Sequence, residues 1–460
     1  MEKKSCRNKF LLSLSLCFSI FVLATGFAPK HLNIISDCIA SNVQLQASKA
    51  VPTSHFTKQN PASLKPWLTW TKVKGAVVYE LELSTTLPKN PESVTKDSNC
   101  FYSTKQIYVN GFNADLSQNL TGNHFYWRVR GLDIEGNPIS DFSDAEKVYV
   151  DPKEDVIAKP IPTAIFNQGP GSILLYPVYD WIPISGAAKF EVEILDALPE
   201  NPNGIAPSIH RIDSAIVTGS EYYDEKPRVS DEPFYWRVRG LDNDGNPVGV
   251  YSDAGELTVS TTPRISVATF GDSITHGGGG ISYSPSNWEY DYQHYLDFPT
   301  INLGRSGDTS QTMVDRFEQD VLPFHPRYLI IMGGTNSLRG GVPAAEVIAN
   351  LQTLKEKCLE NHIRPVFLTL PPINPANIKR AFNESTVSDW QEQIQLVNEF
   401  ILTQVYIDIT RDMSCPNGIL PEKLAVDGLH LDIDGKKIMA DAINADWPRI
   451  ERIPWHKWLD

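Results

Sequence analysis

Cysteine is scarce in this sequence of 460 residues, and the common metal-binding and cofactor-binding motifs are absent. Two of its six cysteines, Cys6 and Cys17, lie close to the start, and the other four, Cys38, Cys100, Cys358 and Cys415, match no zinc-binding spacing. A disulfide between Cys358 and Cys415 is compatible with an exported protein, but spacing alone does not establish it. Neither a His-Glu-x-x-His motif nor a dinucleotide fingerprint occurs. These absences argue against zinc-dependent and dinucleotide-dependent enzymes.

Positive charge is also in deficit. The chain carries 41 Lys and Arg against 55 Asp and Glu, a formal net charge of −14. Nucleic-acid binding needs clustered cations, so this balance argues against a nucleic-acid partner and against tight binding to anionic lipid. The glycine run at 277–280 is not followed by Gly-Lys-Ser/Thr, so it does not indicate a phosphate-binding loop.

Long apolar runs are absent except near the start of the sequence. Four cations at Lys3, Lys4, Arg7 and Lys9 precede an apolar stretch over 10–28, a pattern typical of a secretory signal. We expect a signal peptide over 1–26, with an uncleaved membrane anchor as the alternative, and a linker over 27–60. This predicts a secreted or cell-envelope protein and leaves the periplasm and the exterior both open.

A repeat divides the next part of the chain. The segment FYWRVRGLDIEGNP at 125–138 differs at two positions from the later segment FYWRVRGLDNDGNP at 234–247. Apolar and polar residues alternate in each copy, so Trp127 and Val129 would face one way and Arg128 the other. Gly-Asn-Pro turns follow these strands. The pattern predicts two tandem all-β sandwiches, at 61–152 and 158–261, which resemble fibronectin type III domains.

From residue 263 to 455 strand and helix patterns alternate. Five strand candidates are separated by amphipathic helical segments, including 344–362 and 389–404; the strands begin at Arg264, Phe298, Arg327, Arg364 and Val405. This alternation predicts a three-layer α/β/α domain with a five-stranded parallel sheet. Ligands bind such sheets beyond the carboxyl ends of the strands.

Four polar motifs follow those strand ends. They are GDS at 271–273, NLGRSGDT at 302–309, GGTNS at 333–337 and DGLH at 427–430. Their order and placement resemble the sequence blocks of the SGNH hydrolases, also called the GDSL lipase/esterase family, over the whole of 263–455. The resemblance implies a flavodoxin-like sheet, a serine ester hydrolase activity and no cofactor or metal.

The resemblance assigns Ser273 as the nucleophile, His430 as its base and Asp427 as the group that orients the imidazole. Taken alone, Ser273 would fit a helix N-cap equally well. The presence of the other three motifs favours its role as a nucleophile. His276 is the rival base, but it has no carboxylate at Asp-x-x-His spacing. Thr275 replaces the second glycine of a G-x-S-x-G elbow, which disfavours an α/β-hydrolase.

The same resemblance implies an oxyanion hole formed by the backbone N–H groups of Ser273 and Gly307 and the side chain of Asn336. Ser337 stands where the family often has Asp, which puts the local loop geometry in question. The aromatic segment 281–297 offers Tyr283, Trp288 and Tyr290 as substrate-binding candidates, with ordinary packing as the alternative.

The sequence therefore predicts a secreted serine ester hydrolase that acts through an acyl-enzyme on an acyl or O-acetyl ester. Cell-wall or polysaccharide material is the expected source of the substrate, and the sandwich domains either attach the chain to such material or act as spacers. A lysophospholipase-like or thioesterase-like acylhydrolase is the alternative. A surface-binding or adhesion protein with an inactive hydrolase domain is the lower alternative.

Overall fold

The computed structural model describes residues 49–90, 96–167, 169, 171, 173–262, 264–279 and 281–459. The expected signal segment, 1–26, and the first part of the expected linker lie outside the described residues. Within the described part of the chain, no helix is long and apolar enough to cross a membrane. Residues 49–60, expected as linker, instead pack on the β-sheets formed by residues 61–151. Ala50 is buried in their core, and Pro52 forms a β-bridge with Trp70.

The first β unit (residues 49–151) contains two antiparallel sheets. One has the order β3-β2-β5-β6 and the other pairs β1 with β4. The strands are β1 (Trp67–Thr69), β2 (Val78–Ser84), β3 (Cys100–Ile107), β4 (Gly111–Asn113), β5 (His124–Leu132) and β6 (Glu146–Tyr149).

The second β unit (residues 158–262) also has two sheets. One has the order β11-β8-β7, and in the other β12 pairs with β9, β13 and β14 while β10 borders β9. The strands are β7 (Ile161–Pro162), β8 (Val178–Ile182), β9 (Lys189–Leu195), β10 (Arg211–Val217), β11 (Glu221–Tyr223), β12 (Ser230–Leu241), β13 (Pro247–Val248) and β14 (Gly255–Val259).

The alternation in the repeated strands places one face of each in a hydrophobic core. Leu81, Trp127 and Val129 are fully buried in the core of the first β unit. The opposite face is covered rather than solvated, because the arginines lie over the rings of Phe142 and Tyr251. Four largely buried ion pairs link the central strands: Arg128–Glu82 at 2.7 Å, Arg130–Glu80 at 2.6 Å, Arg237–Glu193 at 2.5 Å and Arg239–Glu191 at 2.6 Å.

The α/β domain (residues 264–459) is built on a five-stranded parallel sheet of order β16-β15-β17-β18-β19. The five strands confirm those predicted from the sequence: β15 (Val267–Gly271), β16 (Thr300–Asn302), β17 (Tyr328–Met332), β18 (Arg364–Leu368) and β19 (Tyr406–Ile407). Their chain order reverses beside β15, which creates the switch point where such sheets bind ligands.

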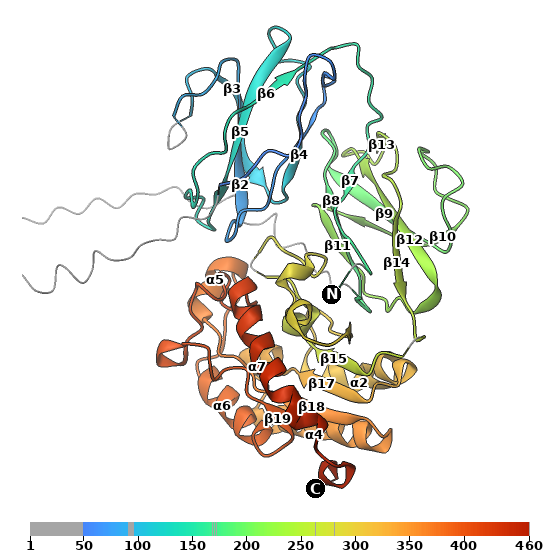
Figure 1. Cartoon of the computed structure of the whole chain (residues 1–460), viewed down its shortest axis with the longest axis vertical. Helices are drawn as coiled ribbons and strands as arrows, with labels where there is room; N and C mark the ends of the chain where they lie inside the picture. The colour runs from blue at the N-terminus through green and yellow to red at the C-terminus, as the bar shows by residue number, and fades with distance from the viewer. Residues whose placement is uncertain are drawn as a thin grey trace, which may run out of the picture.

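Helices cover both faces of this sheet. On one side α4 packs between α2 and α6, and on the other α7 packs against η2, η3 and β19 (Figure 1). The α-helices are α1 (Ser273–His276), α2 (Ser310–Val321), α3 (Thr335–Arg339), α4 (Ala344–Glu360), α5 (Pro375–Phe382), α6 (Trp390–Ile401) and α7 (Ile433–Glu451). The 3-10 helices are η2 (Trp288–Tyr290), η3 (Tyr292–Tyr295), η4 (Leu322–Phe324), η5 (Pro416–Gly418) and η6 (Trp455–Trp458).

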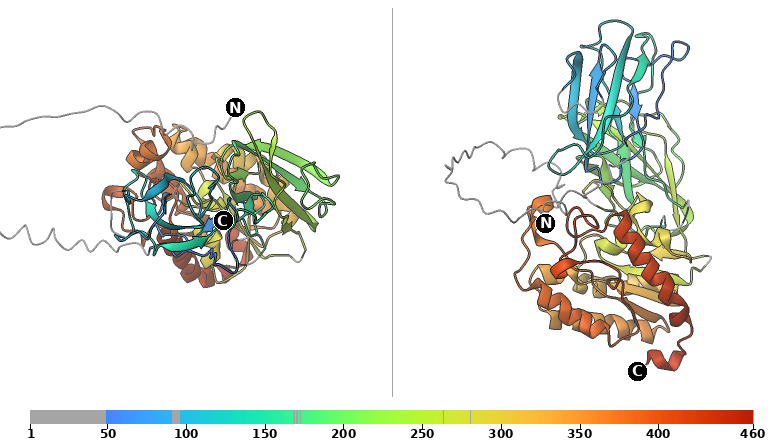
Figure 2. Two further views of the ribbon diagram at one scale, coloured as in Figure 1. Left: turned by 90° about the horizontal axis from the view of Figure 1, so that it is seen from above. Right: turned by 60° about the vertical axis from the view of Figure 1, so that its left-hand side comes forward.

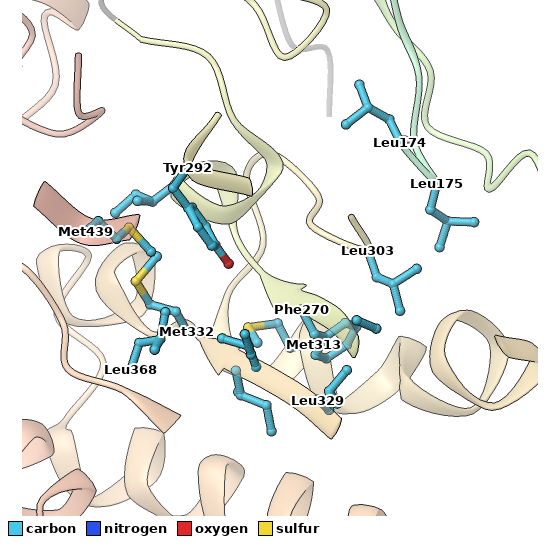
Figure 3. Close-up of a cluster of buried hydrophobic side chains, with 14 of the residues drawn as sticks. Leu174, Leu175, Phe270, Tyr292, Leu303, Met313, Leu329, Met332, Leu368 and Met439 are labelled. Carbon is cyan, nitrogen blue, oxygen red and sulfur yellow. The ribbon is translucent and has the colours of Figure 1, made fainter. Parts of the chain in front are cut away.

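The second β unit and the α/β domain share one hydrophobic core. Leu174 forms a parallel bridge to Asn302 at the edge of the sheet, and the N–H of Leu175 donates to the Asn302 carbonyl oxygen at 3.0 Å. Figure 3 shows Leu174 and Leu175 close to Leu303 of the α/β domain, and all three belong to one buried cluster. The first β unit has a separate core.

Both β units lie on one side of the α/β domain (Figure 1, Figure 2). The first β unit contacts this domain through polar side chains. Lys72 pairs with Glu289 at 2.5 Å, and Lys74 pairs with Asp434 at 2.8 Å. These contacts hold the first β unit against the domain without a shared apolar core.

The disulfide considered between Cys358 and Cys415 does not form, because both residues are free thiols. Cys358 lies on the inner face of α4, fully buried in the core, and burial raises the pKa of its thiol. Cys415 lies next to η5 and is half-buried. A buried thiol with a raised pKa is an inert packing residue rather than a reactive one.

Candidate active site

The four motifs converge at the carboxyl edge of the parallel sheet. Ser273 is the first residue of α1, directly after β15, and Gly307 follows β16. Asn336 lies in α3, directly after β17. Asp427 and His430 lie in the loop between β19 and α7. This convergence follows from the parallel topology, which brings the carboxyl ends of neighbouring strands to the same edge.

Ser273, His430 and Asp427 form a continuous hydrogen-bonded series. His430 Nε2 lies 2.9 Å from Ser273 Oγ, and His430 Nδ1 lies 2.8 Å from Asp427 Oδ2. Because a carboxylate only accepts, Nδ1 carries the proton and Nε2 is left to accept from the serine hydroxyl. Asp427 is fully buried, and its Oδ1 accepts from the backbone N–H groups of Leu429 and His430, each at 2.8 Å. The carboxylate is therefore fixed in position.

The turn from β15 into α1 places Ser273 at the carboxyl edge of the sheet. Gly271 has no room for a side chain, since a Cβ there would lie 2.0 Å from the Met332 carbonyl oxygen. Asp272 caps α1 by accepting from the Ile274 N–H at 3.0 Å, and burial raises the pKa of its carboxyl to about 6. Asp272 thus supports the turn, and its side chain does not line the cavity described below.

The expected oxyanion-hole residues lie around the same space as Ser273. Gly307 has a φ of +86°, a conformation that favours glycine. The Asn336 side chain donates to the Asp308 carbonyl oxygen at 2.9 Å and accepts from Arg339 Nε at 3.2 Å, so its amide is oriented. Ser337, where the family often has Asp, accepts from the Ser310 N–H at 3.0 Å at the start of α2. The substituted residue therefore secures the neighbouring helix.

A comparison with known protein families matches this part of the chain. Residues 269–438 match the profile of the GDSL-like Lipase/Acylhydrolase family. The α/β domain belongs to the GDSL-like lipase/acylhydrolase family. This assigns it to a family of ester hydrolases, and it is hereafter the acylhydrolase domain.

A search of curated proteins finds a relative that is similar to part of the chain. An uncharacterized lipoprotein of Bacillus subtilis (strain 168), YqeF, is 33% identical over 132 residues, which are 25% of this chain and 51% of that protein. The chain thus spans about half the length of this curated relative.

Part of the chain also aligns with solved protein structures. A GDSL-like lipase from Bacteroides thetaiotaomicron is 21% identical, covering 40% of this chain and 88% of that one, with a TM-score of 0.33. An acetyl xylan esterase from Geobacillus stearothermophilus is 20% identical, covering 40% and 94%, with a TM-score of 0.31.

Ser273 and His430 line a cavity of about 950 Å³. The acylhydrolase domain and the second β unit enclose this cavity together. Gly307, Asn336 and His276 also line it. On the side of the second β unit the lining comes from residues 189, 216–218 and 221–225. The sandwich that the sequence predicts as a separate module is thus a wall of the site.

His276, the rival base, lies within the cavity lining but does not contact the Ser273 hydroxyl. Its Nδ1 accepts from the Ser306 N–H at 3.1 Å, and its Nε2 lies 2.7 Å from the Tyr176 carbonyl oxygen. Burial lowers the pKa of its imidazole to about 4. His276 is therefore a neutral residue with both nitrogens occupied, and it has no capacity left to accept a proton from Ser273.

The three aromatic candidates differ in their positions. Tyr283 lines the cavity and stacks on Tyr290, with ring centroids 4.2 Å apart. Tyr290 is buried behind it, and Trp288 packs against the ring of His294 instead. Neither Trp288 nor Tyr290 lines the cavity, so the structure corrects these two predictions toward packing roles and keeps only Tyr283 at the site.

Sequence reasoning missed several residues of the cavity lining. Arg305 lies inside the second motif, and Arg339 pairs with Glu384 at 2.8 Å. Phe382, at the end of α5, packs edge-on against His430 with centroids 6.0 Å apart. Arg305 was within reach of sequence reasoning, because it stands two positions before Gly307. Phe382 and Glu384 follow no strand end, so no motif signals them.

Proposed function

We propose that this chain hydrolyses carboxylic esters through an acyl-enzyme, with Ser273 as nucleophile, His430 as general base and acid, and Asp427 as the residue that orients His430. The observation that carries the proposal is the unbroken series of hydrogen bonds from Asp427 to Ser273, of 2.8 and 2.9 Å, opening into a cavity. A serine hydroxyl becomes a useful nucleophile only when such a base is in contact with it.

In the acylation step, Ser273 Oγ attacks the ester carbonyl carbon while His430 Nε2 takes the hydroxyl proton. The tetrahedral oxyanion is held by the N–H groups of Ser273 and Gly307 and by the amide of Asn336. The C–O bond to the alcohol then breaks, and His430 gives its proton to the departing oxygen. Throughout, Asp427 accepts the hydrogen bond from Nδ1–H and stabilises the imidazolium.

In the second half of the reaction, water attacks the acyl group on Ser273, and His430 Nε2 takes a proton from that water. The oxyanion forms again at the same donors. When the bond to Ser273 Oγ breaks, His430 returns the proton to the serine, and the carboxylic acid leaves. The cycle needs no group beyond the residues of this chain and water.

For the substrate, we propose a short acyl ester, above all an O-acetyl ester, of a polar molecule such as a glycan. The cavity lining carries charges of both signs, four carboxylates and three cations; they are Glu221, Asp224, Glu225, Glu384, Lys189, Arg305 and Arg339. The lining also contains apolar side chains, among them Ile216, Phe382 and Leu429. Such a mixed lining suits a hydroxyl-rich molecule that carries a short acyl group. The intact serine–histidine–aspartate series also speaks against an inactive adhesion protein.

We further propose an envelope or secreted location, with the two β units acting as fibronectin type III-like domains close to cell-wall or polysaccharide material. The lipoprotein relative and the signal-like first residues support this location. Attachment to such material through the β units is part of the same proposal, and pull-down of the full chain by insoluble cell wall tests it.

Hydrolysis of 4-nitrophenyl acetate, butyrate and octanoate by the full chain tests the proposed function. We expect acetate to be preferred, and Ser273→Ala to lose about 10³-fold or more in kcat while a residual rate from the oxyanion donors remains. Ser214→Ala, an exposed serine of β10 away from the cavity, is the matched control and should keep full activity. Equal rates for the parent and Ser273→Ala would contradict the assignment.

A further inference from the structure

The second β unit contributes a continuous stretch of its chain to the catalytic cavity. Residues 221–225, which include strand β11, line the same cavity as Ser273, Gly307 and Asn336. No residue of this stretch follows a strand of the parallel sheet, so the motifs of the acylhydrolase domain do not account for it. A substrate bound at Ser273 is therefore enclosed partly by the second β unit.

The position of this stretch is fixed through the edge of the parallel sheet. Segment 173–177 pairs with Asn302, and the loop after β11 pairs with that segment in turn. The Asp224 N–H donates to the Pro177 carbonyl oxygen at 3.0 Å, and the Arg228 N–H donates to the Leu175 carbonyl oxygen at 2.9 Å. Backbone bonds thus run from the sheet that carries Ser273 to residues 224–228, and they hold β11 at a set distance from the site.

Within this stretch, Tyr223 is the aromatic side chain with the most open surface. It is 38% exposed, whereas Tyr222 stacks on the buried ring of Tyr179 with centroids 5.9 Å apart. The Tyr223 ring meets His276 edge to face, with centroids 6.2 Å apart and an interplanar angle of 74°. Since His276 shares helix α1 with Ser273 and bonds the loop that leads to Gly307, Tyr223 stands beside the reaction centre.

We propose that Tyr223 is a substrate-positioning residue that stacks against the ring of the alcohol part of the ester, and that this alcohol is a sugar. The inference rests on the proposed ester hydrolysis and names its substrate class. An aromatic face packs on the C–H face of a sugar ring with little loss of side-chain entropy. Glu221 and Glu225, which flank Tyr223 in the lining, supply acceptors for the sugar hydroxyls.

On this arrangement the second β unit is a part of the active site that selects the alcohol, while the acylhydrolase domain carries out the chemistry. A ring held by Tyr223 is bound in the ground state and in the transition state alike. Loss of such uniform binding raises KM and leaves kcat unchanged. An ester whose alcohol has no ring gains nothing from Tyr223.

The test compares a mono-O-acetylated methyl glucoside with ethyl acetate, which shares the acyl group and lacks the ring. In the full chain, Tyr223→Ala should raise KM for the sugar ester by about tenfold, with kcat within about twofold, and leave ethyl acetate hydrolysis unchanged. Tyr223→Phe keeps the ring and should restore most of the lost affinity. Tyr235→Ala, in the same β unit and away from the cavity, is the matched control.

Equal effects of Tyr223→Ala on both esters, or no effect on either, would overturn the inference while the ester hydrolase assignment stands. Absence of hydrolysis of both esters by the unsubstituted chain would instead overturn the proposed function. Because the Tyr223 side chain is exposed, Tyr223→Ala should unfold at the same temperature as the parent. Equal unfolding temperatures then show that a change in KM reflects substrate binding and not misfolding.

Discussion

The imidazole of His276 donates a hydrogen bond of 2.7 Å to the backbone carbonyl oxygen of Tyr176. His276 belongs to the turn that carries the nucleophile, and Tyr176 belongs to the segment that joins the second β unit to the sheet edge. Because the other nitrogen accepts from the Ser306 N–H, one side chain links the second β unit to the loop that bears Gly307. His276 therefore serves to position the site.

Replacing His276 by alanine is expected to slow the enzyme without abolishing its activity. The Ser306–Gly307 loop would lose its side-chain partner, and a displacement of about 1 Å at an oxyanion donor costs on the order of 100-fold in kcat. Ser273→Ala removes the nucleophile and should cost far more. Kinetics on 4-nitrophenyl acetate would separate the two, and a His276→Ala variant that folds like the parent yet is as inactive as Ser273→Ala would contradict a positioning role for His276.

Burial of His276 also makes the free energy of unfolding depend on pH. Its pKa falls from 6.5 to about 4 because burial penalises the charged imidazole, and nearby cations, Arg316 first among them, add to this. Between these two pH values the unfolded chain binds a proton that the folded chain does not, so stability falls as the pH drops through this window. The magnitude is about 3 kcal/mol below pH 4.

Urea unfolding of the parent and His276→Gln at pH 7 and pH 4 measures this contribution. The parent should lose about 3 kcal/mol more than the variant between the two pH values. Asp272 and Asp432, whose pKa values burial raises to about 6 and about 7, act in the opposite direction, but both are present in the two proteins. An identical loss in parent and variant would contradict a neutral, buried His276.

The sequence predicted the parallel sheet and the meeting of Ser273 with His430 because both depend on local signals. Short β-branched runs define the strands, and parallel topology brings their ends together. It did not predict the role of the second β unit. That role depends on the bridge between Leu174 and Asn302, a pairing of backbone groups far apart in the chain that no side-chain pattern encodes. This bridge and the backbone bonds from residues 224–228 to segment 173–177 together place Tyr223 beside the site.

The alternation of apolar and polar residues predicted the burial of only one face of the repeated strands. It placed Trp127 and Val129 in the core, but it treated Arg128 and its neighbours only as the opposite face. That face is buried as well, because Glu82 pairs with Arg128 and Phe142 covers the guanidinium. The partner glutamate lies on a different strand, so the pairing emerges only once β2 and β5 are placed side by side.

These buried ion pairs should matter for stability far more than the surface pairs. Arg237 and Glu193 are both fully buried, 2.5 Å apart. Arg237→Ala would leave the Glu193 charge with only Arg211 beside it, and such a loss costs about 3 kcal/mol. Lys159→Ala breaks the exposed pair with Asp253 and should cost at most about 1 kcal/mol. Equal denaturation midpoints for the two variants would contradict this ranking.

The first β unit has a hydrophobic core separate from that of the rest of the chain, which predicts which parts of the chain can be removed. The first β unit has its own hydrophobic core and meets the acylhydrolase domain through polar contacts such as Lys72–Glu289. A chain that begins near residue 156 should therefore fold and hydrolyse 4-nitrophenyl acetate at a rate within about tenfold of the parent, because the losses are single ion pairs and hydrogen bonds, such as Lys74–Asp434 and Tyr79–Tyr283, of small individual worth.

A chain that begins at residue 264 should fail to fold. It lacks Leu174 and Leu175, whose side chains fill the core beside Leu303, and it exposes the sheet edge at Asn302. Loss of two buried leucines alone costs about 4 to 10 kcal/mol, comparable to the whole stability of a typical domain. Soluble expression and a cooperative thermal transition measure the outcome. A stable and active 264–460 fragment would mean that the second β unit is a separable module after all.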